Sequence, residues 1–328
     1  MYVHAHIPSV IRSRSSVQFG TAPNSGVIFD GLTDAEAAVL LHLPSALSRG
    51  HAVRYAARHG VSEDQLDGFV DQLCRAGVAA RLHRPATQAS PMTWSYGEDA
   101  HHVNRALRRS TIEVVGLSAA GIRLTHLLAD AGVGTIHVSD PQVVQNTDVP
   151  LLPASGIGRP RTEATAGTIT NPCTRVFVHP AAHSDLAVVV SGFSVPPTWA
   201  APHMAADRPH LPIVVTEASI EVGPLVRPGL TPCLHCVDLT RRDDDPAWPV
   251  VAAQLRHRPV PLADPLTTTQ AAAFAAREII HTLTWAHAPQ LEGTSWVWNP
   301  RDPVPLVRHW APHADCACGA HDLQSGGD

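Results

Sequence analysis

The chain has 328 residues, of which 44% are hydrophobic and 16% charged, a composition typical of a globular protein long enough for two domains. Acidic residues outnumber arginine and lysine by 29 to 24, and the net charge of −5 argues against nucleic acid as the main partner. The sequence contains no lysine, which excludes Schiff-base chemistry and phosphate binding by a lysine ammonium group. Without a long apolar run or a secretion signal, we expect a cytoplasmic protein.

The first 85 residues predict a small α/β domain. Two β-prone runs, 15–19 and 26–29, flank a turn-forming segment and indicate a hairpin. Thr33 and Ser62 each begin a capping box, which predicts one helix through Leu43 and another that carries Leu73. A further helix is expected near 51–59, and residues 78–82 can return as a strand. A hairpin, three helices and a closing strand describe a winged-helix-like domain, whose role in binding DNA, binding a peptide or stabilising the fold stays open.

The larger domain is expected at 101–320, after a polar, Pro-containing linker at 86–100 and before a disordered tail at 321–328. Five β-rich runs alternate with helical or irregular segments in this domain, and they lie at 111–115, 135–138, 174–178, 186–190 and 212–215. Such alternation is typical of a mostly parallel, doubly wound sheet. The predicted fold class is therefore α/β and Rossmann-like.

A glycine-containing turn follows the first of these strands. Gly116 and Gly121 flank the turn, a helix follows, and the next strand ends at Asp140. This layout is typical of nucleotide-binding folds, in which helix-start N–H groups hold phosphate and the acid holds a ribose. Ser118 stands at the position where a glycine lets the backbone approach phosphate, so a retained fold without nucleotide binding is an equal alternative.

Four of the six cysteines form two close pairs, Cys233 with Cys236 and Cys316 with Cys318. Two such pairs suit a tetrahedral zinc site that joins distant segments, and four protein ligands would make it structural. A redox pair or unrelated thiols are the alternatives. The remaining cysteines, Cys74 and Cys173, are expected to be ordinary buried residues.

Residues 126–150, 156–164 and 168–172 resemble the ThiF/E1 superfamily in order and spacing, and the likeness extends over roughly 100–320, including the paired cysteines. The resemblance implies ATP-dependent adenylation of a carboxylate, usually a protein C-terminus. It assigns a set of nucleotide-binding positions, which are Gly116, Ser118, Gly121, Asp140, Asn146 and Arg161.

The sequence departs from this family at the positions that carry its chemistry. Arg161 (or Arg159) stands at the position of the family's phosphate-contacting lysine. Ser191, Gly192 and Phe193 follow the fourth strand, where the family has an aspartate that positions magnesium. Without that carboxylate the triphosphate loses its metal anchor, so the chain is expected not to catalyse adenylation. An active adenylyltransferase that uses Arg161 and another metal ligand is the alternative.

A narrower resemblance involves residues 223–255, which are similar to E1-like proteins of actinobacterial pathways for thiazole/oxazole-modified microcins. It implies a homodimer whose winged-helix-like domain binds a leader peptide as an added strand and presents it to a separate cyclodehydratase. The groove would be lined by apolar residues that alternatively form the domain core, namely Val17, Phe19, Ile28, Leu66, Phe69, Val70 and Leu73. The leading prediction is thus a non-catalytic, zinc-stabilised E1-like scaffold for a peptide or protein partner, with a DNA-binding regulator as a further alternative.

Overall fold

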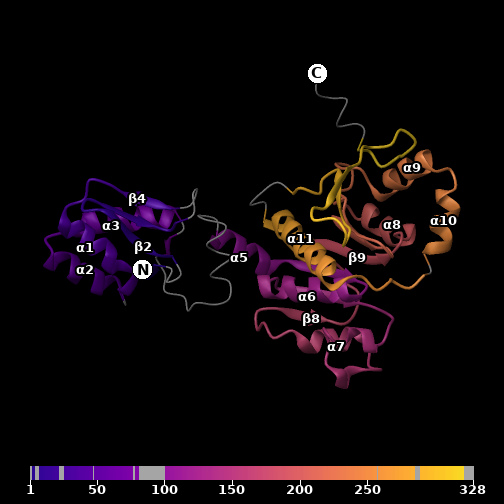
Figure 1. The fold of residues 1–328 in the computed structure, drawn as a ribbon, viewed down its shortest axis with the longest axis horizontal. Helices are drawn as coiled ribbons and strands as arrows, with labels where there is room; N and C mark the ends of the chain where they lie inside the picture. The colour runs from indigo at the N-terminus through magenta and orange to yellow at the C-terminus, as the bar shows by residue number, and fades with distance from the viewer. Residues whose placement is uncertain are drawn as a thin grey trace. The chain divides into compact units, whose positions relative to one another are not determined.

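The computed structural model describes residues 2–3, 7–21, 26–46, 48–76, 78–80, 100–256, 258–284 and 289–320. The chain divides into two compact units, residues 1–105 and 106–328 (Figure 1). The domain boundaries at 85 and 101 remain predictions. Of the predicted linker at 86–100, residues 86–99 lie outside the described residues, as does the tail at 321–328.

The first unit combines an antiparallel sheet of order β2-β3-β4 with three α-helices. Its elements are β1 (Tyr2–Val3), β2 (Ser9–Ser13), β3 (Ser16–Phe19), β4 (Val27–Phe29), α1 (Asp34–His42), η1 (Leu43–Ser45), α2 (Arg49–Arg58), α3 (Glu63–Arg75) and β5 (Ala79–Ala80). The predicted hairpin is confirmed as β3 and β4, and the predicted helices as α1 to α3. Both capping boxes are present, at Thr33 and Ser62. The sequence reading missed β2, which pairs with β3, and β1, which pairs with β5.

Alternation along the strands of the first unit directs one face of the sheet into a hydrophobic core. Val17 and Phe19 on β3 and Phe29 on β4 are buried, and they meet Leu66 and Leu73 from α3. Phe29 lies edge-to-face between Phe19 and Phe69, with ring centroids 6.1 and 5.5 Å away. All buried members of this core come from residues 7–79, so the first unit has a core of its own.

The second unit is built on an eight-stranded sheet of order β13-β12-β11-β10-β9-β6-β7-β8. Its strands are β6 (Thr111–Val115), β7 (Thr135–Ser139), β8 (Arg175–Phe177), β9 (Leu186–Gly192), β10 (His210–Val215), β11 (Ile220–Val222), β12 (Thr294–Trp298) and β13 (Leu306–His309). The five predicted strands are confirmed as the parallel part, β6 to β10. The antiparallel extension β11 to β13 was not predicted.

Helices cover this sheet as expected for a doubly wound fold. They are α6 (Ala119–Ala131), α7 (Arg161–Thr168), α8 (Pro197–Ala205), α9 (Leu234–Asp244), α10 (Trp248–Leu255) and α11 (Pro265–Thr284), with the short turns η3 (Asn146–Asp148) and η4 (Ala154–Gly156). The helix α5 (Ala100–Arg109) precedes β6 and crosses the boundary between the two units. The long helix α11 lies beside α6 (Figure 1). Ala271, Ala272 and Ala275 on α11 are fully buried, and such small side chains let two helices approach closely.

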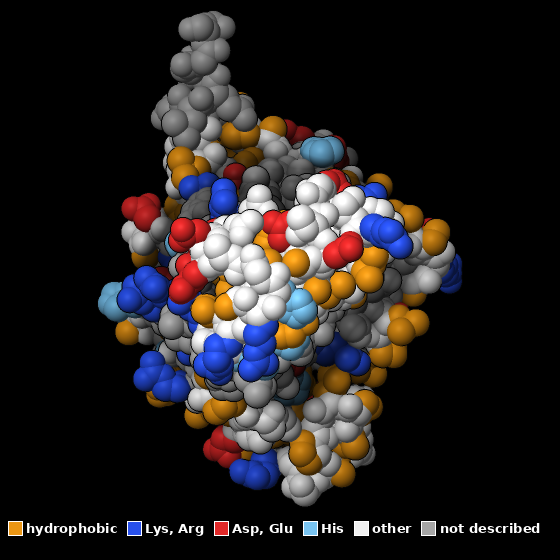
Figure 2. Space-filling view, turned by 90° about the vertical axis from the view of Figure 1, so that its left-hand side faces the viewer, with side chains coloured by type: hydrophobic (Ala, Val, Ile, Leu, Met, Phe, Trp, Pro, Cys, Tyr) orange, Lys and Arg blue, Asp and Glu red, His pale blue; other side chains and the backbone are white. Residues whose placement is uncertain are grey.

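Charged side chains of both signs appear on the face of the molecule drawn in Figure 2. Among the described residues, no helix has both the length and the apolar character needed to cross a bilayer.

Candidate functional site

The turn between β6 and α6 keeps the tight geometry of a nucleotide-binding loop. Gly116 has a φ of 89°, and a Cβ there would lie 2.3 Å from the carbonyl oxygen of Val190 on β9. A Cβ at Gly121 would lie 2.0 Å from the carbonyl oxygen of Gly116, so this glycine lets α6 pack onto the loop. Both positions require glycine for backbone reasons that hold with or without a ligand.

Ser118 occupies the N-cap position of α6 but its side chain makes no capping hydrogen bond. Its Oγ is buried, as is Oγ of Ser139 at the end of β7, and neither has a hydrogen-bond partner in the described structure. Ser118 thus carries a buried hydroxyl at the position where dinucleotide-binding turns have a glycine that lets the backbone approach phosphate.

Asp140 follows β7 and lies against the glycine turn, as the sequence predicted. Its Oδ2 accepts a hydrogen bond from the Leu117 N–H at 2.5 Å, and its Oδ1 accepts one from the Gln142 N–H at 2.7 Å. Arg161, the first residue of α7, also reaches Asp140, with Nη1 3.4 Å from Oδ2. The structure therefore brings Asp140 and Arg161 together with the loop, while the side chain of Asn146, the first residue of η3, is exposed.

Asp148 completes this group of charged residues, and the sequence reading missed it. Arg161 donates from Nε to Asp148 Oδ2 at 3.1 Å, and its Nη2 lies 3.1 Å from the same oxygen. The three side chains are almost enclosed, with 5% of Asp140, 8% of Asp148 and 12% of Arg161 exposed. A signal was present in the sequence, because two aspartates and two arginines fall within residues 140–161.

The carboxyl end of β9 carries no carboxylate. Ser191 uses its hydroxyl to donate to the Ser194 carbonyl at 2.6 Å, and Gly192 ends the strand. A Cβ at Gly192 would lie 3.1 Å from Val260 Cα and 3.2 Å from the Pro259 carbonyl oxygen, so the segment between α10 and α11 packs directly over this strand end. Ser191, Gly192 and Phe193 at the end of this strand supply no anionic oxygen ligand for the magnesium of a bound triphosphate.

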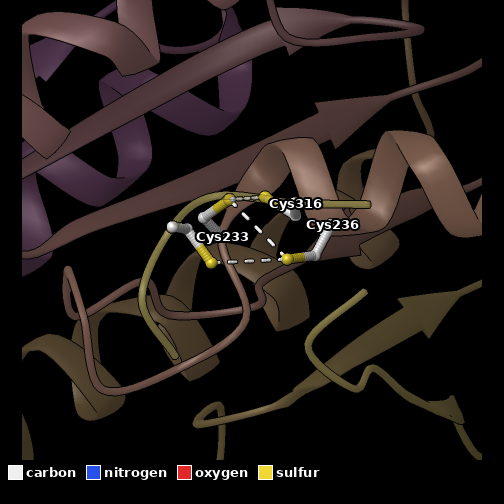
Figure 3. A group of neighbouring side chains, drawn as sticks. Cys233, Cys236 and Cys316 are labelled. Atoms are coloured by element: carbon white, nitrogen blue, oxygen red, sulfur yellow. Dashed lines mark hydrogen bonds between the residues drawn. The ribbon is translucent and has the colours of Figure 1, made fainter. Parts of the chain in front are cut away.

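The four paired cysteines come together at the start of α9. Cys233 Sγ lies 3.8 Å from Cys236 Sγ and 3.6 Å from Cys316 Sγ, and Cys236 Sγ lies 3.6 Å from Cys318 Sγ (Figure 3). All four sulfurs lie within 4.8 Å of one another and could hold a metal ion. Val226 and Leu239 pack around the group, so it is enclosed by apolar side chains.

The chemistry of these sulfurs suits a cation. Hydrogen bonding from the Cys233 thiol lowers the pKa of Cys236, and the same interaction raises the pKa of Cys233. Burial raises the pKa of Cys316 to about 11. A buried cluster of thiols with one readily formed thiolate gains most from a bound divalent ion, which stabilises the deprotonated form of every ligand. The other cysteines lie elsewhere, and Cys173 is exposed, contrary to the expectation of burial.

The predicted peptide-binding residues of the first unit divide into two sets. Five belong to the core and are not available at the surface, and these are Val17, Phe19, Leu66, Val70 and Leu73. The other two residues are at least partly exposed. Ile28 on β4 is 45% exposed, and Phe69 on α3 is partly buried against Phe29. In the described structure, β4 pairs with β3 alone and forms an edge of its sheet.

No protein-family model and no curated protein matches the sequence. Solved structures do match. MccB from E. coli with selenomethionine MccA gives a TM-score of 0.66 at 15% identity, covering 97% of this chain and 98% of that one. MccB from E. coli with ATP gives 0.63 at 14% identity, with 97% and 98% covered.

Two further solved structures match over nearly their whole length. The microcin C7 biosynthetic enzyme MccB in complex with N-formylated MccA gives a TM-score of 0.64 at 14% identity, covering 97% of this chain and 99% of that one. PaaA gives 0.66 at 13% identity, with 92% and 98% covered. At such low identity these matches establish the fold alone. The chain shares the α/β fold of MccB and PaaA, and this fold contains both the Gly116 turn and the four cysteines.

Proposed function

We propose that the protein is a non-catalytic E1-like scaffold that binds a peptide or protein partner. The observation that carries the proposal is the carboxyl end of β9, where Ser191 and Gly192 offer no carboxylate and residues 259–261 pack over the strand. Adenylation needs a metal ion to balance the charge that develops on the triphosphate, and the end of β9 offers no carboxylate to hold it. The protein thus retains the fold but has lost the metal-dependent adenylation reaction.

A peptide is the partner that the first unit suits best. MccB has been solved with MccA in selenomethionine and N-formylated forms, which identify MccA as a polypeptide. In this chain we assign the role to the winged-helix-like unit, where β4 pairs with β3 alone among the described residues and Ile28 and the partly buried Phe69 offer apolar contacts. A leader peptide would add as a strand beside β4, and a separate cyclodehydratase would then act on the peptide's core.

The experiment measures binding of fluorescently labelled leader peptides to the full chain by fluorescence anisotropy. Ile28→Asp places a charge on the proposed contact surface and is expected to weaken binding at least roughly tenfold. Ile11→Asp is the matched control, because Ile11 is also exposed but lies on β2, the opposite edge strand of the same sheet. Equal losses in both variants, or binding that neither variant alters, would contradict the assignment to β4.

An active adenylyltransferase is the second candidate, and the observations that favour it are the preserved Gly116 turn and the MccB structure with ATP. The two candidates differ in ATP–pyrophosphate exchange in the presence of the peptide. We expect no exchange above background from the wild-type chain. Exchange that disappears in Asp140→Ala would instead establish the enzyme.

We further propose that the four cysteines bind structural zinc and that the protein is a homodimer. A tetrahedral zinc ion with bonds of about 2.3 Å places its sulfurs about 3.8 Å apart, and the three sulfur–sulfur distances of 3.6 to 3.8 Å are compatible with that geometry. Four protein ligands would leave no position for substrate, so the metal would stabilise the fold. Elemental analysis and light scattering of the purified protein test the metal and the oligomeric state.

A further inference from the structure

The carboxylate of Asp140 has little capacity left for a ligand. Its Oδ2 accepts the Leu117 N–H and faces Arg161 Nη1, and its Oδ1 accepts the Gln142 N–H. An ionised carboxylate offers about four lone-pair directions, so most of them are taken. Because only 5% of the side chain is exposed, a ribose hydroxyl could reach Asp140 only by displacing Arg161.

Asp148 holds Arg161 in this position. Two nitrogens of the guanidinium lie 3.1 Å from Asp148 Oδ2, and the same oxygen accepts the Gln145 N–H at 2.9 Å. The backbone of Asp148 is fixed as well, since its N–H donates to the Gln145 carbonyl at 2.9 Å. Moving Arg161 away would leave two nearly buried carboxylates without their cation, which is unfavourable in an enclosed site.

We infer that Arg161 is an internal ligand of Asp140, that Asp148 is the residue that positions it, and that this pair excludes nucleosides from the site. The inference rests on the proposed loss of nucleotide chemistry, but it concerns binding and not catalysis. It assigns Arg161 a role opposite to that of a phosphate-binding residue. The guanidinium occupies the place where the fold would otherwise accept a ribose.

Two hydroxyl groups beside the Gly116 turn support the inference that a polar binding site is still present and that Arg161 covers it. Ser118 Oγ and Ser139 Oγ are buried and have no partner in the described structure. Buried polar atoms are normally satisfied, so these two mark a place where a polar ligand would gain hydrogen bonds. Releasing Arg161 should therefore allow a nucleoside to bind.

The test uses adenosine, which carries a ribose but no phosphate, and measures its binding to the full chain by calorimetry or ligand-observed NMR. We expect Arg161→Gln and Asp148→Asn to bind adenosine roughly ten- to hundredfold more tightly than the wild-type chain, the range of a lost charged hydrogen bond. The double variant should bind no more tightly than Arg161→Gln alone, because Asp148 acts through Arg161. Asp148→Glu keeps the negative charge that Asp148→Asn removes, so this variant should bind adenosine nearly as weakly as the wild-type chain.

Matched controls separate this role from a structural one. Arg159→Gln removes an arginine whose salt bridge to Glu163 is exposed, and it should leave adenosine binding unchanged. Adding Asp140→Ala to Arg161→Gln should abolish the gain. Thermal melts verify that each variant is folded, and Arg161→Gln alone still tests the inference if Asp148→Asn unfolds.

Two results would overturn the inference. The first is that the wild-type chain binds adenosine as tightly as the variants do. The second is that a folded Arg161→Gln variant binds adenosine no more tightly than the wild-type chain. Neither result bears on the proposed function, which fails separately if the wild-type chain supports ATP–pyrophosphate exchange.

Discussion

At the scale of single residues, burial changes the chemistry of groups far from the nucleotide loop. His210, at the start of β10, is fully buried, and its Nε2 has no hydrogen-bond partner in the described structure. Burial lowers the pKa of His210 to about 4, although a hydrogen bond between its Nδ1 and the Arg208 carbonyl opposes the shift. The folded protein therefore keeps this imidazole neutral under conditions in which the unfolded chain takes up a proton.

This difference predicts acid sensitivity. The unfolded histidine binds a proton below about pH 6.5, and the folded one does so only near pH 4, so stability is present above 6.5 and falls by roughly 3 kcal/mol as the pH drops to 4. Urea titrations of wild type and His210→Phe between pH 4 and 7 should show a shallower pH dependence for the variant. The exposed His309 provides the control, since His309→Gln should keep the wild-type slope.

Residue types alone identified much of the candidate site. Asp140 was placed correctly beside the Gly116 turn because strand ends and glycine turns are local features of the sequence. The pairing of Arg161 with Asp148 was not anticipated, because it depends on how η3 and α7 fold back beside β7. The apolar residues proposed for a groove were mostly core residues, since a sequence shows hydrophobicity but not which side of a sheet is covered.

At the scale of elements, local signals predicted the helices and the parallel strands well. Capping boxes fixed the starts of α1 and α3, and continuous apolar runs marked strands buried on both faces, such as β9 and β10. The strands β11 and β12 were missed because they are short and pair with each other across more than 70 residues. Such pairing depends on tertiary contacts that no local pattern contains.

The metal-binding cluster leads to a prediction at this scale. Cys233 and Cys236 lie at the start of α9, whereas Cys316 and Cys318 lie beyond β13, so a metal ion would attach the helix to the end of the chain. Cys316→Ser, or removal of the metal by a chelator, should lower the melting temperature on the order of 10 °C. Cys173→Ser replaces an exposed free cysteine and should change neither metal content nor melting temperature. A chelator without effect on a metal-loaded sample would rule out a stabilising metal.

At the scale of the whole molecule, the two compact units have different sources of stability. The first relies on a small core drawn entirely from residues 7–79, and the second on a large sheet and the cysteine cluster. We therefore expect two calorimetric transitions. Leu66→Ala, a truncation in the first core costing about 2–5 kcal/mol, should lower one transition, and a chelator should lower the other. A single transition shifted by both treatments would show that the units unfold together.

The arrangement of the cysteines also bears on how the second unit withstands damage. Residues 237–315 run from one cysteine pair to the other and include β12, β13 and the helices α10 and α11. With a metal ion bound to both pairs, this stretch becomes a closed ring. A protease cut inside the ring would leave two fragments that stay associated through the metal as well as through contacts such as the β11–β12 pairing, and withdrawing the metal would weaken that association.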